Sequence, residues 1–236
     1  CSSDLLKEEM IMNYAIAIDI GGTNTRVALI NEAYEIEQRV QFATDAKDPR
    51  ATIEAIRQAI EGFGKEARGI GLSCPGPLDL IHGYILTMTN LGRNWYNYPI
   101  CEKLSEATGL PVYLENDANL ACLAEACIGR GKDYPYVSFL TVSTGVGAGL
   151  VIHRQIYQGA HGFAHEIANI PLWKDGPSHG TIYPGGVEAI SSGTAITSRA
   201  QKAGLTVTHA GEVNDLAVAG NETAAQIIDD AKEYLA

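Results

Sequence analysis

One feature constrains the fold of this chain more than any other: a glycine-containing turn between two apolar runs occurs twice. The first turn, Gly21-Gly22, separates two apolar runs within residues 14–30. The second turn lies in residues 145–149, which contain three glycines, and separates two apolar runs within residues 136–152. Short aliphatic runs on both sides of a turn predict a hairpin of two strands. Because the feature recurs at corresponding places in two halves, the sequence predicts an α/β protein with two related lobes.

The rest of the chain alternates predicted strands with predicted helices. Asp48-Pro49 is typical of a helix start, with an N-cap followed by proline in the first turn. The predicted strands are 14–20, 26–30, 35–42, 69–72, 112–114, 136–141 and 150–152, and the first three form a meander. The predicted helices start near 49, 99, 120 and 222, with Asn221 as the candidate cap of the last one. We interpret residues 1–12 as a leader or cloning remnant, 13–115 as an N-terminal lobe, and 116–236 as a C-terminal lobe that is incomplete at its C-terminus.

Composition and charge exclude some classes of partner. The chain is 46% hydrophobic, enough for a sizeable core, and has no apolar run of the roughly 20 residues that a membrane span needs. Its net charge of −11, without a long Lys/Arg cluster, argues against nucleic acid or an anionic membrane as the main partner. The five cysteines form no CxxC pair, which favours reduced thiols in a cytoplasmic protein.

The first glycine turn has the chemistry of a phosphate site. Glycine permits a positive φ, and its missing side chain lets backbone N–H groups approach a phosphate. Asp19 precedes the turn, where it is a candidate to hold Mg²⁺ directly or through water, and Thr23 and Thr25 are candidate hydroxyl donors. The alternative interpretation is a tight turn with an Asp at a buried edge.

Acidic side chains elsewhere are candidates for chemistry on a hydroxyl group. Asp117 lies between a predicted strand and a predicted helix, where the helix dipole keeps a carboxylate ionised, so it is a candidate general base. The alternative is that Asn116 or Asp117 only caps the helix. Glu166 and Glu188 each follow a glycine-containing turn, where they either hold sugar hydroxyls or are simply solvated.

Six segments resemble one known family when they are considered together. They are Asp19-Ile20-Gly21-Gly22-Thr23, Cys74-Pro75-Gly76-Pro77, Thr89-Asn90-Leu91, Glu115-Asn116-Asp117-Ala118-Asn119, Ser143-Thr144-Gly145-Val146-Gly147-Ala148-Gly149 and Gly159-Ala160-His161-Gly162. Each is a weak signal alone, but their order and spacing resemble the ROK family of sugar kinases and sugar-responsive repressors, from about residue 14 to the last residue.

The resemblance implies an α/β, actin-like ATPase (ribonuclease H-like) fold of two lobes with an interlobe cleft. It also implies transfer of the γ-phosphoryl group of ATP to a hydroxyl of a hexose or hexose derivative, with Asp117 as the base. The residues expected at the ATP phosphates and Mg²⁺ are Asp19, Gly21, Gly22, Thr23, Thr25, Thr144 and Gly145. Those expected at the sugar are Gly76, Asn90, Asn116, Asp117, Glu166, Asn169 and Glu188. We further expect a homodimer.

One departure from the family pattern concerns its zinc site, which the resemblance places on one His and three Cys. The four corresponding positions hold Asn169, His179, Thr181 and Gly186, so we expect no zinc site. The usual glycine before Glu166 is replaced by a histidine. The main alternative function is a non-catalytic sugar-sensing regulator or binding module of the same family. Only about a dozen residues precede the first strand, too few for a helix-turn-helix, which favours the kinase.

Overall fold

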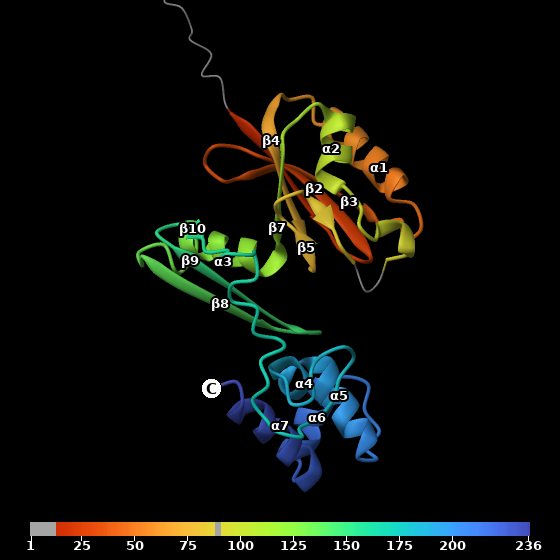
Figure 1. The fold of residues 1–236 in the computed structure, drawn as a ribbon, viewed down its shortest axis with the longest axis vertical. Helices are drawn as coiled ribbons and strands as arrows, with labels where there is room; N and C mark the ends of the chain where they lie inside the picture. The colour runs from red at the N-terminus through yellow and green to blue at the C-terminus, as the bar shows by residue number, and fades with distance from the viewer. Residues whose placement is uncertain (1–12, 88–90) are drawn as a thin grey trace, which may run out of the picture. The chain divides into compact units, whose positions relative to one another are not determined.

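The computed structural model describes residues 13–87 and 91–236, which divide between Asp117 and Ala118 into two compact units (Figure 1). The first unit contains β1 Tyr14–Ile20, β2 Asn24–Ile30, β3 Ile36–Ala43, α1 Pro49–Gly62, β4 Ala67–Cys74, β5 Leu78–Asp79, β6 Tyr84–Ile85, η1 Arg93–Trp95, α2 Ile100–Thr108 and β7 Val112–Asn116. Helix α3, Asp117–Cys127, begins at the division, and the second unit continues with β8 Tyr136–Val142, β9 Val146–Ile152, β10 Gln155–Ile156, α4 Val187–Ser191, α5 Gly193–Lys202, α6 Ala210–Val218 and α7 Glu222–Glu233.

The first unit is built on a five-stranded sheet in the order β3-β2-β1-β4-β7. Strands β1 to β3 form the predicted antiparallel meander, whereas β4 and β7 run parallel to β1. The register pairs Asp19 with Ser73, and Ser73 with Glu115. The carboxyl ends of β1, β4 and β7 therefore meet at one edge of the sheet. The predicted strands 69–72 and 112–114 are each longer in the structure, and both extend toward this edge.

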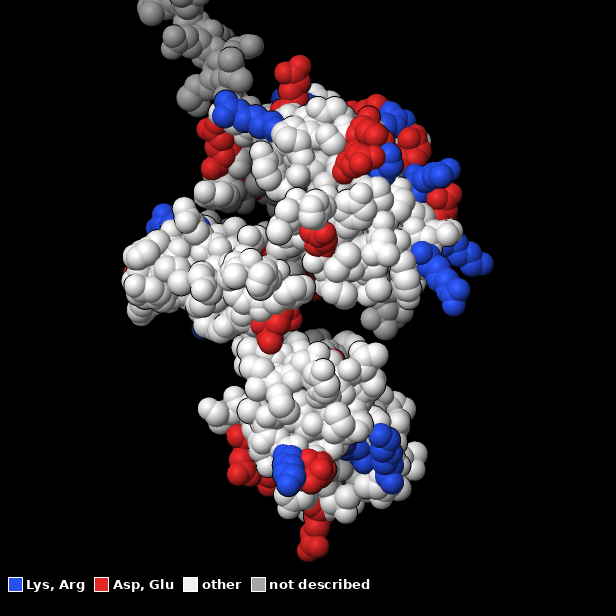
Figure 2. Space-filling view, viewed as in Figure 1, with Lys and Arg blue, Asp and Glu red and all other residues white. Residues whose placement is uncertain are grey.

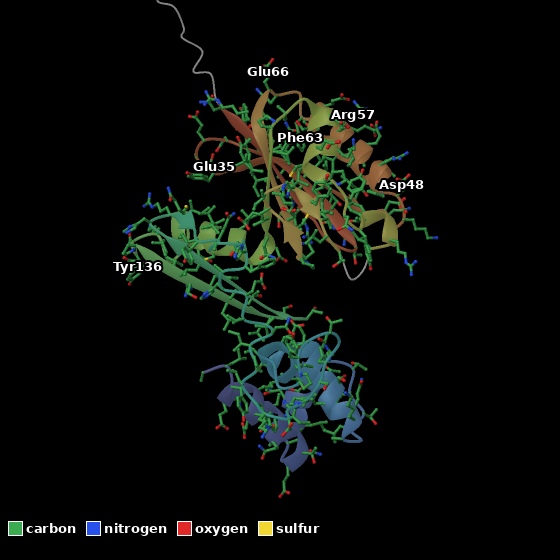
Figure 3. The ribbon with its side chains drawn as sticks, viewed as in Figure 1. Glu35, Asp48, Arg57, Phe63, Glu66 and Tyr136 are labelled. Atoms are coloured by element: carbon green, nitrogen blue, oxygen red, sulfur yellow. The ribbon has the colours of Figure 1, made fainter. Side chains whose placement is uncertain are left out.

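Helices α1 and α2 lie side by side against one face of this sheet (Figure 1). The predicted start of α1 is confirmed: Asp48 is the N-cap, its side chain accepts a hydrogen bond from the Arg50 N–H, and proline occupies the first turn. The helix buries Ile53 and Ile56 in the core, where each side chain stabilises the fold by roughly 1.5–3 kcal/mol. Figure 3 marks Asp48 at one end of α1 and Arg57 farther along it.

Charged side chains gather on the outer surface of α1. Arg57 forms ion pairs with Glu54 and Glu61, one turn away on either side. Figure 2 shows such basic and acidic side chains side by side on this unit. Because α1 buries one face and exposes the charged one, its amphipathic sequence is enough to explain its place on the sheet.

The second unit contains a three-stranded sheet, β10-β9-β8, one face of which packs on α3. The sequence predicted a glycine turn over 145–149, but β9 starts at Val146, so Gly147 and Gly149 lie within a strand. A Cβ at Gly149 would lie 2.8 Å from both the Ala118 carbonyl oxygen and the Cys122 Cβ. These glycines therefore allow β9 to approach α3 closely, and only residues 143–145 form the turn.

Four helices complete the second unit. Helices α5, α6 and α7 bury a separate apolar cluster that includes Ile196, Val213, Ile227 and Ile228. The predicted cap of the last helix is confirmed, because the Asn221 side chain accepts a hydrogen bond from the Ala224 N–H at 2.9 Å. In the described part of the chain, no helix combines the length and apolar character required to span a bilayer.

Candidate active site

Polar side chains gather in the first unit where the parallel strands end. Asp19 is next to last in β1, and Asn116 ends β7 opposite Cys74 of β4. Asp117 follows as the first residue of α3 and is exposed. The edge thus carries Asp19 and the Asn116-Asp117 pair, brought together by strand register although they are far apart in sequence.

Asp19 and Asp117 both act on the pKa of the buried Cys74 thiol. Burial is the main reason that the pKa of Cys74 lies well above its ordinary value. The negative charge of Asp19, then Cys101, and then the negative charge of Asp117 raise this pKa further. Two carboxylates at one edge of a sheet suit a site that binds a cation or orients a hydroxyl group.

The first hairpin turn, residues 21–23 between β1 and β2, is stabilised by hydrogen bonds of the Thr44 side chain. The Thr44 hydroxyl donates to the Gly21 carbonyl oxygen at 2.8 Å and lies 2.9 Å from the Thr25 hydroxyl. Thr25 is fully buried, so its position favours a role in supporting the turn over a direct contact with phosphate.

The glycines of this turn do not provide a left-handed backbone. Among the described residues, neither Gly21 nor Gly22 is one of the glycines with positive φ. The Gly21 N–H donates to the Asn24 carbonyl oxygen at 2.9 Å, which closes the turn. The N–H groups of Gly22 and Thr23 have no acceptor within residues 13–87 and 91–236. They are therefore the donors that this turn offers to an anion.

Asp19 has a neighbour that the sequence analysis did not consider. The Arg26 guanidinium donates to the Asp19 carboxylate at 2.8 Å across the β1–β2 pair, and Arg26 also donates to the Gln41 side chain at 3.2 Å. The side chains of Asp19 and Arg26 are 41% and 49% exposed. Such an exposed pair contributes at most about 1 kcal/mol and leaves the carboxylate accessible to other ligands.

Of the residues predicted at the sugar, Gly76 lies near this edge of the sheet. A Cβ at Gly76 would lie 3.6 Å from the Asn116 side-chain nitrogen, so the loop after β4 passes directly over Asn116. Asn90, also predicted at the sugar, lies outside the described residues.

The second hairpin turn, residues 143–145 between β8 and β9, is bound by Glu188. The Glu188 carboxylate oxygen Oε2 accepts the Val146 N–H at 2.8 Å. A Cβ at Gly145 would lie 2.7 Å from the same oxygen, so a larger residue at this position would displace the Glu188 carboxylate. The structure therefore places Glu188, which the sequence assigned to the sugar, directly against Thr144-Gly145, the residues assigned to phosphate.

Glu166 and Asn169 lie in the long irregular segment between β10 and α4, and both are exposed. The Asn169 side-chain oxygen accepts the Tyr183 N–H at 3.0 Å. His165 adopts a positive φ of 66°, a conformation typical of glycine, and its ring nitrogen Nε2 lies 2.8 Å from the Ser138 hydroxyl. The positive φ explains why a glycine also fits this position.

Comparison with known proteins identifies the family. The family model described as "ROK family" matches residues 15–236. The chain belongs to the ROK family. A glucokinase of Thermotoga maritima is 32% identical over 186 residues, which cover 77% of this chain and 58% of that relative. An N-acetylmannosamine kinase of Citrobacter koseri is 33% identical over 224 residues, which cover 94% and 76%. The alignment thus spans a little over half of the glucokinase.

Solved structures agree with this assignment. The ROK hexokinase from Thermus thermophilus has a TM-score of 0.85 and 32% identity, with coverage of 94% of this chain and 74% of that one. A ROK family glucokinase from Streptomyces griseus, in complex with glucose and AMPPNP, has a TM-score of 0.71 and 26% identity, with coverage of 94% and 76%. The predicted actin-like α/β fold is therefore confirmed.

Three of the four positions for which the family resemblance implies zinc ligands make other local contacts in this chain. Asn169 accepts a backbone N–H, as described above, and the His179 ring lies 2.9 Å from the Thr194 hydroxyl. A Cβ at Gly186 would lie 2.9 Å from the Ile182 side chain, so this position has no room for a ligand side chain. In the part of the chain described here, no three His, Cys, Asp or Glu side chains cluster as a metal site.

The sequence analysis missed the residues that support the second hairpin turn. These residues lie at the junction of α4 and α5, where Ser192 caps α5 by accepting the Ala195 N–H at 3.1 Å. A serine followed by Gly193-Thr194 is a recognisable helix-start pattern. That pattern would have located the helix, but not its contact with a turn some 50 residues earlier.

Proposed function

We propose that the protein containing this chain transfers the γ-phosphoryl group of ATP to a hydroxyl of a hexose or hexose derivative, with Asp117 as the general base. The observation that carries the proposal is that Asp19 and Asp117 lie at the same edge of the sheet, where β1, β4 and β7 end. The kinase names of the ROK relatives and the glucose and AMPPNP bound in one structural neighbour support it.

Asp117 is suited to orient a hydroxyl and to accept its proton. The carboxylate is exposed and begins α3, where the helix dipole favours its ionised form. Phosphoryl transfer passes through a loose transition state, so the proton leaves the hydroxyl late and an ordinary carboxylate is a sufficient base. Asp117 therefore acts mainly by holding the hydroxyl oxygen in line with the phosphoryl group.

The two hairpin turns are proposed to bind the phosphates through backbone N–H groups. Besides Gly22 and Thr23, the N–H groups of Thr144 and Gly145 have no acceptor in the described residues. Such free donors fit an anionic ligand. The half-exposed Asp19 carboxylate fits Mg²⁺, directly or through water, and Arg26 then shares that carboxylate. When bound, Mg²⁺ neutralises charge on the phosphate oxygens.

The residues proposed to contact the sugar are Gly76, Asn90, Asn116, Asp117, Glu166, Asn169 and Glu188. Within the described residues, Glu188 uses only Oε2 for the Val146 N–H, so Oε1 remains free to accept a sugar hydroxyl. In this proposal the Glu188 side chain contacts the sugar through Oε1 and the second hairpin turn through Oε2.

An ADP-release assay tests this proposal and identifies the sugar. The protein is incubated with ATP, Mg²⁺ and, one at a time, glucose, fructose, mannose, allose, N-acetylmannosamine and aryl β-glucosides. We expect sugar-dependent ADP release with at least one of them. Sugar binding without ADP release would instead support the sugar-sensing alternative. The cytoplasmic location and the homodimer remain predictions, and sedimentation tests the second.

A further inference from the structure

A histidine and a threonine form a hydrogen-bonded bridge to the second hairpin turn. The Thr194 hydroxyl donates to the Thr144 carbonyl oxygen at 2.6 Å, and the His179 ring nitrogen Nε2 lies 2.9 Å from the same hydroxyl. A hydroxyl carries one hydrogen, which Thr194 directs to Thr144, so toward His179 it acts as an acceptor. The His179 Nε2 therefore carries a hydrogen and donates it. The Ser192 hydroxyl, 3.4 Å away, is the remaining polar contact.

The N-terminus of α5 holds a second carbonyl group of the same turn. The Gly193 N–H donates to the Ser143 carbonyl oxygen at 2.8 Å. A Cβ at Gly193 would lie 2.9 Å from that oxygen, so this close approach depends on glycine. Two consecutive carbonyl groups, those of Ser143 and Thr144, are thus fixed by two consecutive residues of α5.

Peptide geometry links these carbonyl groups to the proposed phosphate donors. A peptide unit is planar and trans, so its C=O and the following N–H point in opposite directions. Fixing the Ser143 carbonyl fixes the direction of the Thr144 N–H, and fixing the Thr144 carbonyl fixes that of the Gly145 N–H. Both N–H groups consequently point away from α5, with no acceptor among the described residues.

We propose that His179 and Thr194 are positioning residues for phosphate binding by the second hairpin turn. This inference rests on the proposed function, which assigns the Thr144 and Gly145 N–H groups to ATP. His179 acts through Thr194: its hydrogen bond keeps the hydroxyl directed at the Thr144 carbonyl and thereby keeps the Gly145 N–H in the orientation that binds phosphate. At this position, where the family resemblance implies a zinc ligand, a hydrogen bond from the histidine ring connects the loop to the turn.

Steady-state kinetics with matched variants test the proposal. Thr194→Val removes the hydroxyl without changing the shape of the side chain, and His179→Ala removes the donor. We expect each to raise the KM for ATP by roughly 2- to 10-fold, the effect of one hydrogen bond, with the sugar KM within about twofold. Thr194→Ser and His179→Gln keep the required groups and should retain a near wild-type KM. The control Thr197→Val removes a hydroxyl from α5 that donates to the Gly193 carbonyl, so it should leave the KM for ATP unchanged.

The double variant separates positioning from a general loss of structure. If His179 acts through Thr194, His179→Ala should add little to the KM for ATP once Thr194 is valine. An unchanged KM for ATP in Thr194→Val would overturn the proposal. The proposal would also be overturned if the KM for ATP and the KM for sugar rose equally in these variants and in Thr197→Val, because that result indicates a general structural effect.

Hydrogen exchange without nucleotide keeps this test separate from that of the proposed function. We expect the amides of Val146 and Gly193, which are both hydrogen-bonded at the turn, to exchange faster in Thr194→Val and His179→Ala than in Thr197→Val. If the wild-type protein phosphorylates no sugar, the proposed function fails, and unchanged exchange would then overturn the positioning role too. Faster exchange in an inactive protein would support the bridge and contradict only the kinase.

Discussion

Replacing Gly149 by alanine tests how closely β9 packs on α3. The added Cβ would lie 2.8 Å from the Ala118 carbonyl oxygen, 2.8 Å from the Cys122 Cβ and 3.0 Å from the Asn119 Cα. Two of these three atoms belong to the helix backbone, which cannot move aside as the end of a flexible side chain can. The strand or the helix must therefore shift to accommodate a single methyl group.

The structure allows the size of this effect to be estimated. Overpacking of this kind typically costs about 1–3 kcal/mol. Alanine also restricts the unfolded chain, which offsets about 0.4–1 kcal/mol because the φ of Gly149 is not positive. We expect Gly149→Ala to destabilise the second unit by about 1–2 kcal/mol. Gly62→Ala is the matched control: this glycine is in the last turn of α1 with no atom within 4 Å of its added Cβ, so the change should stabilise by up to about 1 kcal/mol.

Urea unfolding and hydrogen exchange measure the two changes. Gly149→Ala should lower the urea midpoint and speed exchange in α3 and β9, while the amides of β1 and β4 keep their wild-type rates. Gly62→Ala should leave the midpoint unchanged or raise it. A Gly149→Ala protein as stable as the wild type would refute the argument that glycine is needed for the contact between β9 and α3.

Three further predictions concern the phosphate turn, acid stability and zinc. Gly22→Val should place a side chain beside the N–H groups of residues 22 and 23, and so raise the KM for ATP at least several-fold while sugar affinity is unchanged. Unchanged ATP kinetics would show that this turn does not bind phosphate. The hydrogen bond from Arg57, and then that from Gln58, lowers the pKa of Glu54 from 4.5 to about 2. The ionised Glu54 carboxylate therefore stabilises the fold above pH 4.5, and this stabilisation is lost as the pH falls toward 2. Glu54→Gln should show a smaller fall in the urea midpoint than the wild type over that pH range, and an identical fall would contradict the ion pair. Metal analysis of protein purified without a His-tag should find no stoichiometric zinc, and near-stoichiometric zinc that survives mild chelation would disprove this.

Features of this fold that depend on neighbouring residues in the sequence were predictable. Asp48-Pro49 and Asn221 start their helices as expected, because a cap needs only its own side chain and the next few N–H groups. The two hairpins were also predicted, since each joins adjacent strands. Strict alternation along β2 would even have placed Thr25 on the buried face with Val27, a signal that the sequence analysis did not use.

Features that depend on distant contacts were not predictable from one sequence. Gly147 and Gly149 were interpreted as turn residues, but they are strand residues because α3 packs against them. The contacts of Thr194 with His179 and with Thr144 span 15 and 50 residues. No local sequence pattern marks such pairs. The motifs therefore identified the candidate site residues, whereas the hydrogen bonds of Thr194 with His179 and Thr144 became visible only in the structure.

The measurement that tests the central claim most directly is transfer of labelled phosphate from [γ-³²P]ATP to sugar by the wild-type protein and by Asp117→Asn. Asparagine has almost the same shape but accepts no proton, and loss of a general base costs about 10²–10⁴ in rate. We predict a labelled sugar phosphate with the wild type, a rate reduced by that factor in Asp117→Asn, and sugar affinity within a few-fold of the wild type. A variant that keeps most of its transfer rate would show that Asp117 only begins the helix and that the base lies elsewhere.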